Sequence, residues 1–114
     1  MLSTLSFFAS GPAGYFVNKD RQEIVQGAGV DIAGSQNIPL VVLIGKSTVS
    51  FGEVFAGILK DLGRAYLIGE PTQGNVELLS VFNFSDGSRL WIATGTFRPI
   101  HHPDQVWERV GVQP

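Results

Sequence analysis

One stretch of this chain limits its possible folds more than any other, namely PLVVLIGKSTVSFGEVFAGILKDLGRAYLIG at residues 39–69. Leu40–Ile44 is a continuous aliphatic run, which is typical of a parallel strand buried on both faces. Apolar residues then recur at the spacing of one helical face, starting directly after Ser50: Phe51, Val54, Phe55, Ile58 and Leu59. Gly63 suits the end of that helix, and Ala65–Ile68 indicates a second buried strand. We therefore predict a β-α-β unit with a right-handed crossover and with Leu40–Ile44 as the central strand.

Turns and loops divide the chain before this unit. Leu2–Ala9 has the pattern of a short apolar helix that ends at Gly11 and Pro12. Two short strands, Tyr15–Lys19 and Glu23–Gln26, are expected around a charged turn. A glycine-rich loop then leads into the aliphatic strand.

A hairpin is expected after the unit. Val76–Phe84 and Arg89–Phe97 flank the turn sequence S-D-G-S at residues 85–88, and Asp-Gly favours a turn with positive φ. Residues 98–114 are predicted to be mostly loop.

The composition excludes several classes of function. A net charge of −2 with scattered Lys and Arg provides no basic surface for nucleic acid. No apolar run approaches the ~20 residues of a membrane span, and the first residues do not resemble a signal peptide. The 114 residues allow one domain at most, and their 44% hydrophobic content is sufficient for a core. The absence of cysteine leaves the redox compartment and the localisation undetermined.

Neither of two glycine-containing motifs predicts a nucleotide site. The sequence G-K-S at 45–47 follows a predicted strand, but the leading glycine of a phosphate loop would have to stand where Leu40 is. The sequence G-A-G at 27–29 lacks the third glycine of a dinucleotide fingerprint, because Ile32 occupies that position. We therefore expect no cofactor.

Ser50 stands at the joint between the predicted strand and helix, and the residues alone leave two interpretations open. Ser50 and Glu53 have the S-x-x-E spacing of a capping box, which would contribute about 1 kcal/mol to the helix. Alternatively, a hydroxyl on such a joint faces a cleft, where the free N–H groups of the first helical turn can stabilise an oxyanion. The N–H of Phe51 would be such a donor, and Ser50 would then be a nucleophile.

Several motifs occur together in the second part of the chain: the strand and helix of residues 39–69, G-E-P-T-Q-G-N at 69–75, D-G-S-R-L-W-I-A-T-G-T-F-R-P at 86–99 and E-R-V-G-V-Q-P at 108–114. In this order they resemble the second half of the protease domain of the C-terminal processing (tail-specific) proteases, a family that includes the tricorn core protease. The resemblance covers residues 38–114, which would bear the nucleophile, whereas residues 1–37 resemble the connecting helix and strands only loosely. It implies an α/β fold of ClpP/crotonase-like β-β-α units with a mainly parallel sheet, of which this chain would be a truncated half-domain.

The resemblance also implies roles for individual residues. Ser50 matches the acyl-forming nucleophile, while Asn75 occupies the position of the lysine that is the base in many relatives, and an amide cannot accept the proton. In the tricorn-like branch the base is a histidine from the first half of the domain, which would lie before Met1. Glu108 matches the glutamate that orients that site, although a solvated loop carboxylate is an equally simple interpretation. Asp61 matches an aspartate that supports the dyad in some relatives, but a surface position at the helix end is expected.

The remaining candidates are expected to be structural. His101 and His102 are adjacent, so at most one could face the serine, and without a spaced third ligand they do not predict a metal site. A loop or surface position is expected for both. Lys46 would be charged in solvent and is a weak base candidate. Trp91 and Trp107 are expected to pack in the core rather than to stack on a substrate.

The sequence therefore predicts a serine endopeptidase that cleaves polypeptides through an acyl-enzyme on Ser50, with this chain alone inactive because it lacks a base. Two alternatives stay open, namely a pseudoprotease that only binds peptides and a structural or assembly domain. The expected partner is a polypeptide substrate. Truncation would expose apolar surface beside Leu2, Leu5 and Phe8, which favours association between copies of the chain.

Overall fold

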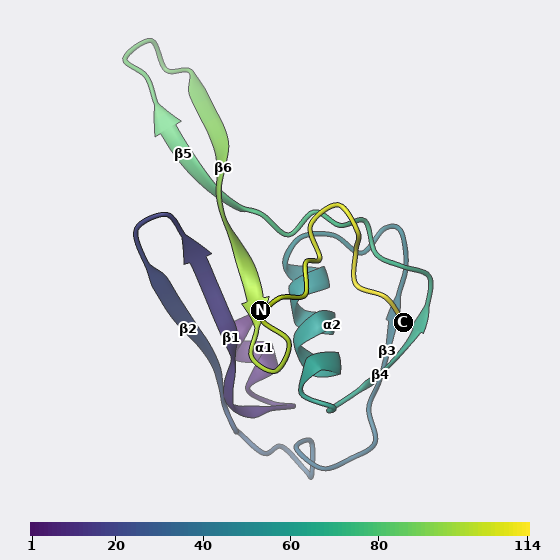
Figure 1. The fold of residues 1–114 in the computed structure, drawn as a ribbon. Coiled ribbons are helices and arrows are strands. Elements are labelled where there is room, and N and C mark those ends of the chain that lie inside the picture. The colour runs from purple at the N-terminus through teal and green to yellow at the C-terminus, as the bar shows by residue number, and fades with distance from the viewer.

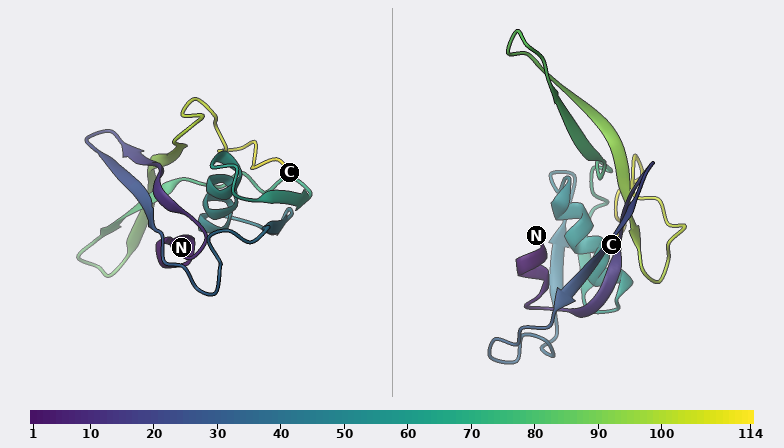
Figure 2. Two further views of the ribbon diagram at one scale, coloured as in Figure 1. Left: turned by 90° about the horizontal axis from the view of Figure 1, so that it is seen from below. Right: turned by 90° about the vertical axis from the view of Figure 1, so that its left-hand side faces the viewer.

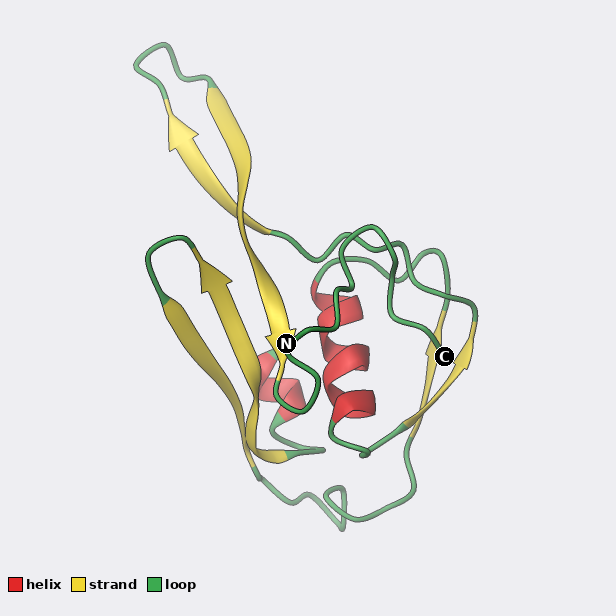
Figure 3. Ribbon diagram, viewed as in Figure 1, coloured by secondary structure: helices red, strands yellow, loops and turns green.

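The computed structural model describes residues 1–114, which form two helices and six strands in two sheets (Figures 1 and 3). The helices are α1 (Leu2–Leu5) and α2 (Phe51–Asp61), and the strands are β1 (Ser10–Asn18), β2 (Gln22–Ala28), β3 (Val41–Ile44), β4 (Tyr66–Gly69), β5 (Leu78–Asn83) and β6 (Arg89–Pro99). Neither helix has the length and apolar character that crossing a membrane requires.

Helix α2 lies between the two sheets (Figures 1 and 2). The larger sheet has the strand order β2-β1-β6-β5, and each neighbouring pair is antiparallel. The smaller sheet pairs β3 with β4 in parallel, with Val41 opposite Tyr66 and Ile44 opposite Gly69. Parallel strands need a long crossover, which α2 provides. The predicted β-α-β unit is therefore confirmed.

The predicted mainly parallel sheet is not confirmed, because only β3 and β4 pair in parallel and the larger sheet is antiparallel throughout. The reason lies in the connections. Strands β1 and β2, like β5 and β6, follow one another across short turns, and such turns can join only antiparallel neighbours. The coarser description, a mixed α/β fold, holds.

The smaller sheet is covered on one face only. Val41 and Leu43 of β3 are 51% and 78% exposed, and Tyr66 and Ile68 of β4 are 80% and 54% exposed. Val42, Ile44 and Leu67 alternate with these residues along the strands, so they point the other way, and they are buried or partly buried. The predictions of strands buried on both faces and of a central β3 are therefore wrong, since α2 covers just one side.

The apolar face of α2 forms the centre of the core. Val54, Ile58 and Leu59 are at most 1% exposed, as the helical spacing predicts. Gly63 follows the helix with a φ of +63°, a conformation that glycine adopts without strain, so the predicted helix end is confirmed. Phe51 is an exception, since it is half exposed at the first turn.

Trp107 connects the C-terminal loop to both layers. It is 3% exposed and stacks on Phe97 of β6, with ring centroids 5.5 Å apart and an interplanar angle of 17°. On its other side it presses against α2 at Gly57, where an added Cβ would lie 2.5 Å from the Trp107 ring. The predicted core position of Trp107 is confirmed, and Gly57 provides the space for it.

The N-terminal segment differs from the prediction. Helix α1 ends at Leu5, and Gly11 and Pro12 belong to β1, where they pair with β2 rather than ending a helix. Leu5 is fully buried and Phe8 packs partly buried against the core, whereas Leu2 is 46% exposed. The expected exposed patch is therefore wrong for Leu5, because the short helix turns this side chain inward. The two predicted strands are confirmed and are longer than expected.

Strands β5 and β6 form the predicted hairpin, and its outer part projects from the body of the molecule (Figures 1 and 2). Strand β1 pairs with β6 only at Gly95–Pro99, so residues 89–94 pair with β5 alone. Gly87 has a φ of +85°, as the Asp-Gly turn predicts. Trp91 lies on this projecting arm and is 58% exposed, so its predicted core position is wrong.

Candidate active site

Ser50 lies at the entrance to α2 and is exposed, with a φ of 56° and a ψ of −128°. A positive φ is unusual for a residue other than glycine and persists only where the surroundings hold it in place. Two contacts hold the backbone here, because the Ser50 N–H donates to the carbonyl oxygen of Asn75 at 3.0 Å and to Glu53 Oε1 at 3.1 Å. The exposed serine thus stands on a strained joint that two hydrogen bonds hold in place.

The first turn of α2 leaves one backbone donor free. Gly52 N–H donates to Val49, and the N–H groups of Glu53 and Val54 donate to the Ser50 carbonyl, whereas Phe51 N–H has no partner. Ser50 and Glu53 have the capping-box arrangement, but the Ser50 hydroxyl makes no cap hydrogen bond of normal geometry. The geometry leaves both the hydroxyl and the neighbouring N–H available to a ligand.

The carboxylate of Glu53 is fully buried and is surrounded by donors. Oε1 accepts hydrogen bonds from the N–H groups of Ser50 at 3.1 Å and Asn75 at 2.8 Å. Oε2 accepts from Gly74 N–H at 2.6 Å and from the Thr72 hydroxyl. An ionised carboxylate can only accept, so four donors match its capacity. Glu53 therefore fastens the Ser50 joint to the loop of residues 72–75.

The C-terminal segment docks on the same loop. Thr72 N–H donates to the Val112 carbonyl at 3.1 Å, and Arg109 N–H donates to the Gly74 carbonyl at 2.7 Å. The two segments approach so closely that a Cβ on Gly111, whose φ is +77°, would lie 2.2 Å from the Thr72 carbonyl oxygen. The G-E-P-T-Q-G-N and E-R-V-G-V-Q-P motifs therefore form one packed unit.

Glu108 is half-buried, so it is not a fully solvated loop carboxylate. Its Oε2 accepts a hydrogen bond from Val76 N–H at 2.9 Å. Val76 directly follows Asn75, whose carbonyl holds Ser50 N–H. Glu108 is therefore connected to the Ser50 joint through two adjacent residues, and it also faces Glu77. Burial, and then the contact with Glu108, raise the pKa of Glu77 above its ordinary value.

This pair predicts a specific pH dependence. Because the folded-state pKa of Glu77 is raised, its contribution to stability is present at low pH and is lost as the pH rises through that pKa. Glu77→Gln removes the repulsion, so its melting temperature should exceed that of the wild type at pH 7 and equal it near pH 4. Thermal unfolding across this range measures the effect. Glu70→Gln, whose side chain is 66% exposed, is the control, and a Glu77→Gln variant no more stable at pH 7 would contradict the assignment.

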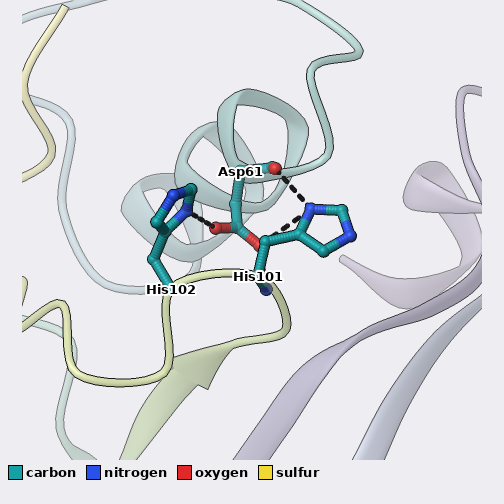
Figure 4. A network of polar contacts seen from close by, with 3 residues as sticks. All are labelled: Asp61, His101 and His102. Atoms are coloured by element: carbon teal, nitrogen blue, oxygen red, sulfur yellow. Dashed lines mark hydrogen bonds and ion pairs between the residues drawn. The ribbon is translucent and has the colours of Figure 1, made fainter.

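Asp61, His101 and His102 meet at the opposite end of α2 (Figure 4). The Asp61 carboxylate accepts from His101 N–H at 2.9 Å and contacts His102 Nδ1 at 2.7 Å, and the two rings cover it from opposite sides. The Asp61 side chain is 1% exposed, so its predicted surface position is wrong, whereas the exposed loop position of both histidines is confirmed. Helix α2 has 11 residues and Asp61 is the last of them, so this cluster lies roughly 16 Å from Ser50 along the helix axis.

A cavity of about 530 Å³ lies beside this cluster, lined by Lys60 and Trp107 among others, and is therefore also remote from Ser50. Neither histidine can reach the serine from there. Lys46 is 84% exposed and its nearest acidic partner is Glu70 at 4.0 Å. No group of three or more side chains that could hold a metal ion is present. The described residues therefore place no base against the Ser50 hydroxyl.

Two contributors to this site were not predicted. The S-x-x-E spacing indicates that Glu53 lies near Ser50 N–H, but it gives no sign of the contacts to Thr72, Gly74 and Asn75. Thr72 stands in the G-E-P-T motif, which is a signal of its importance but not of its partner. The contacts of Glu53 and Thr72 arise only in the tertiary structure, which brings the loop of residues 72–75 to the start of α2.

An exposed serine on a strained strand-to-helix joint, beside a free backbone N–H, is the arrangement expected at the nucleophile of a serine hydrolase. The sequence comparison is more specific, because the profile of Peptidase family S41 matches residues 2–114. The chain belongs to this family of serine peptidases.

Named relatives agree with this membership. The chain is 45% identical over 76 residues to carboxyl-terminal-processing peptidase 2, chloroplastic, of Arabidopsis thaliana, covering 67% of this chain and 14% of that protein. It is 35% identical over 118 residues to the chloroplastic C-terminal processing peptidase of Tetradesmus obliquus, covering 90% and 25%. Among solved structures, a photosystem II D1 C-terminal processing protease matches with a TM-score of 0.82 and 29% identity, covering 97% of this chain and 28% of the other. The chain thus spans a quarter or less of the length of these two curated relatives.

Proposed function

We propose that the natural protein is a serine endopeptidase in which Ser50 attacks the scissile carbonyl and forms an acyl-enzyme that water resolves. The observation that supports this most directly is the exposed hydroxyl on the strained joint next to the free Phe51 N–H. That N–H would donate to the oxyanion, and stabilisation of this kind is often the largest single contribution to catalysis. The relatives are named for carboxyl-terminal processing, so we propose a polypeptide cut near its carboxyl terminus as the substrate.

The base would be a histidine from outside residues 1–114, as in the tricorn-like arrangement. Asn75 cannot take the lysine's role, and the histidines of this chain lie at the other end of α2. Residues 1–114 alone should therefore be inactive. The natural domain would complete a ClpP/crotonase-like fold around the Ser50 helix, with residues 1–37 as its connecting part and 38–114 as its nucleophile-bearing part. Association between copies of the chain stays a further prediction.

Labelling of the natural full-length protein with a serine-directed phosphonate tests the proposal. Peptide mass mapping should find the adduct on Ser50, because a serine is reactive towards such probes only when a base and an oxyanion site act on it. Residues 1–114 alone should not be labelled. Absence of labelling in the full-length protein, with a substrate tail still bound, would favour the alternative pseudoprotease, which the asparagine at position 75 suggests. Absence of both would favour an assembly domain.

Glu108 is proposed to orient the incoming base. Glu108→Gln retains an oxygen for Val76 N–H but loses the negative charge, so labelling and turnover should slow about 10- to 100-fold while the fold is kept. The measurement is the labelling rate beside the melting temperature. Asp104→Asn, an exposed loop carboxylate, is the control. An unchanged rate in Glu108→Gln would rule out the orienting role.

A further inference from the structure

Thr72 connects two segments that lie far apart in the sequence. Its hydroxyl donates to Glu53 Oε2 and accepts the Val112 N–H at 2.7 Å, and the residue is only 6% exposed. A hydroxyl can donate one hydrogen bond and accept others at the same oxygen atom. Thr72 therefore satisfies a buried carboxylate and a buried backbone donor together.

The chain of contacts continues to the candidate nucleophile. Glu53 Oε2 accepts a hydrogen bond from the Thr72 hydroxyl, and Oε1 accepts hydrogen bonds from the N–H groups of Ser50 and Asn75. The path from Val112 N–H to Ser50 N–H thus contains only two side chains, Thr72 and Glu53, and both are shielded from water. Hydrogen bonds in such a low-dielectric setting are stronger and polarise one another.

We propose that Thr72 is a positioning residue for Ser50, which transmits the docking of the C-terminal segment at Val112 through Glu53 to the serine joint. This rests on the proposed role of Ser50 as nucleophile. The strained φ of 56° at Ser50 is the reason that such support is needed, because an unsupported joint would relax and turn the hydroxyl away from its productive direction. Thr72 touches no reacting atom and acts only through Glu53.

Three variants of the natural full-length protein separate positioning from simple stability. Thr72→Val keeps the shape and loses both hydrogen bonds, and Thr72→Ser restores the hydroxyl. Thr94→Val is the matched control, because the Thr94 hydroxyl makes a similar contact of 2.7 Å with Ser80 Oγ on the exposed arm. All three are compared with the wild type under identical conditions.

The main measurement is the time course of phosphonate labelling at saturating probe, which gives a rate constant and a final labelled fraction. A positioning role predicts a rate constant about 10- to 100-fold lower for Thr72→Val, since small displacements of a reacting group cost this much. Thr72→Ser should stay within about threefold of the wild type, and Thr94→Val should match it. If Thr72→Val only lowers the labelled fraction while the folded molecules react at the wild-type rate, the residue is merely structural and the proposal is overturned.

Hydrogen exchange supplies a readout that does not depend on activity. Thr72→Val should accelerate amide exchange in peptides that cover residues 50–53, whereas Thr72→Ser and Thr94→Val should not. Unchanged exchange at these residues in Thr72→Val would overturn the connection between Thr72 and the joint. If the wild type is not labelled, the proposed function is rejected. The hydrogen-exchange result then tests the connection between Thr72 and the Ser50 joint by itself.

Discussion

Ser50→Ala in the natural full-length protein should abolish both polypeptide cleavage and phosphonate labelling, a loss of at least about 1,000-fold. The substitution removes the exposed hydroxyl of the joint, while the contacts of Ser50 N–H with Asn75 and Glu53 are retained. Cleavage of an unfolded polypeptide, followed by mass spectrometry, measures the effect.

The stability of Ser50→Ala separates the two interpretations of this residue. A serine that served as a helix cap would cost about 1 kcal/mol when replaced, with activity intact. Since the hydroxyl makes no cap hydrogen bond of normal geometry, the melting temperature should stay near that of the wild type. A destabilised variant that still cleaves would show that Ser50 is a cap and not the nucleophile.

Glu53→Ala should have the largest effect on stability of any single substitution near the site. It leaves the Gly74 N–H and the Thr72 hydroxyl without their acceptor in a buried position and the Asn75 N–H in a partly buried one, and it leaves a cavity. Each unsatisfied buried group costs about 1–3 kcal/mol, so the total loss should be about 4 kcal/mol. The melting temperature should fall by about 16 °C for a domain of this size, and labelling of the remaining folded molecules should slow.

Two companion variants make this result specific. Glu53→Gln keeps the shape and one acceptor oxygen, but its NH2 group faces two donors, so an intermediate loss of about 2 kcal/mol is expected. Glu23→Ala removes an exposed glutamate that pairs only with Arg21 and should cost no more than about 1 kcal/mol. If Glu53→Ala were no less stable than Glu23→Ala, the four hydrogen bonds assigned to Glu53 would not exist in solution.

The sequence predicted the elements whose signals are local. The helical spacing from Phe51 to Leu59 predicted α2, and the Asp-Gly turn predicted the hairpin. It failed where burial depends on distant partners. Leu40–Ile44 has the composition of a doubly buried strand, yet Leu43 is 78% exposed, because only the neighbouring elements determine which faces are covered. The predicted core position of Trp91 was wrong for the same reason.

Periodicity and turn chemistry act over a few residues, so the sequence by itself determined the strand-to-helix joint, its exposed serine and the family to which the motifs point. Only the tertiary structure decided what surrounds that serine. It joined Glu53 to Thr72 and Asn75 across about 20 residues of chain, and it carried His101 and His102 to the far end of the helix. Contacts of this kind depend on how separate elements pack and on the entropy of closing the loops between them, neither of which a local pattern records.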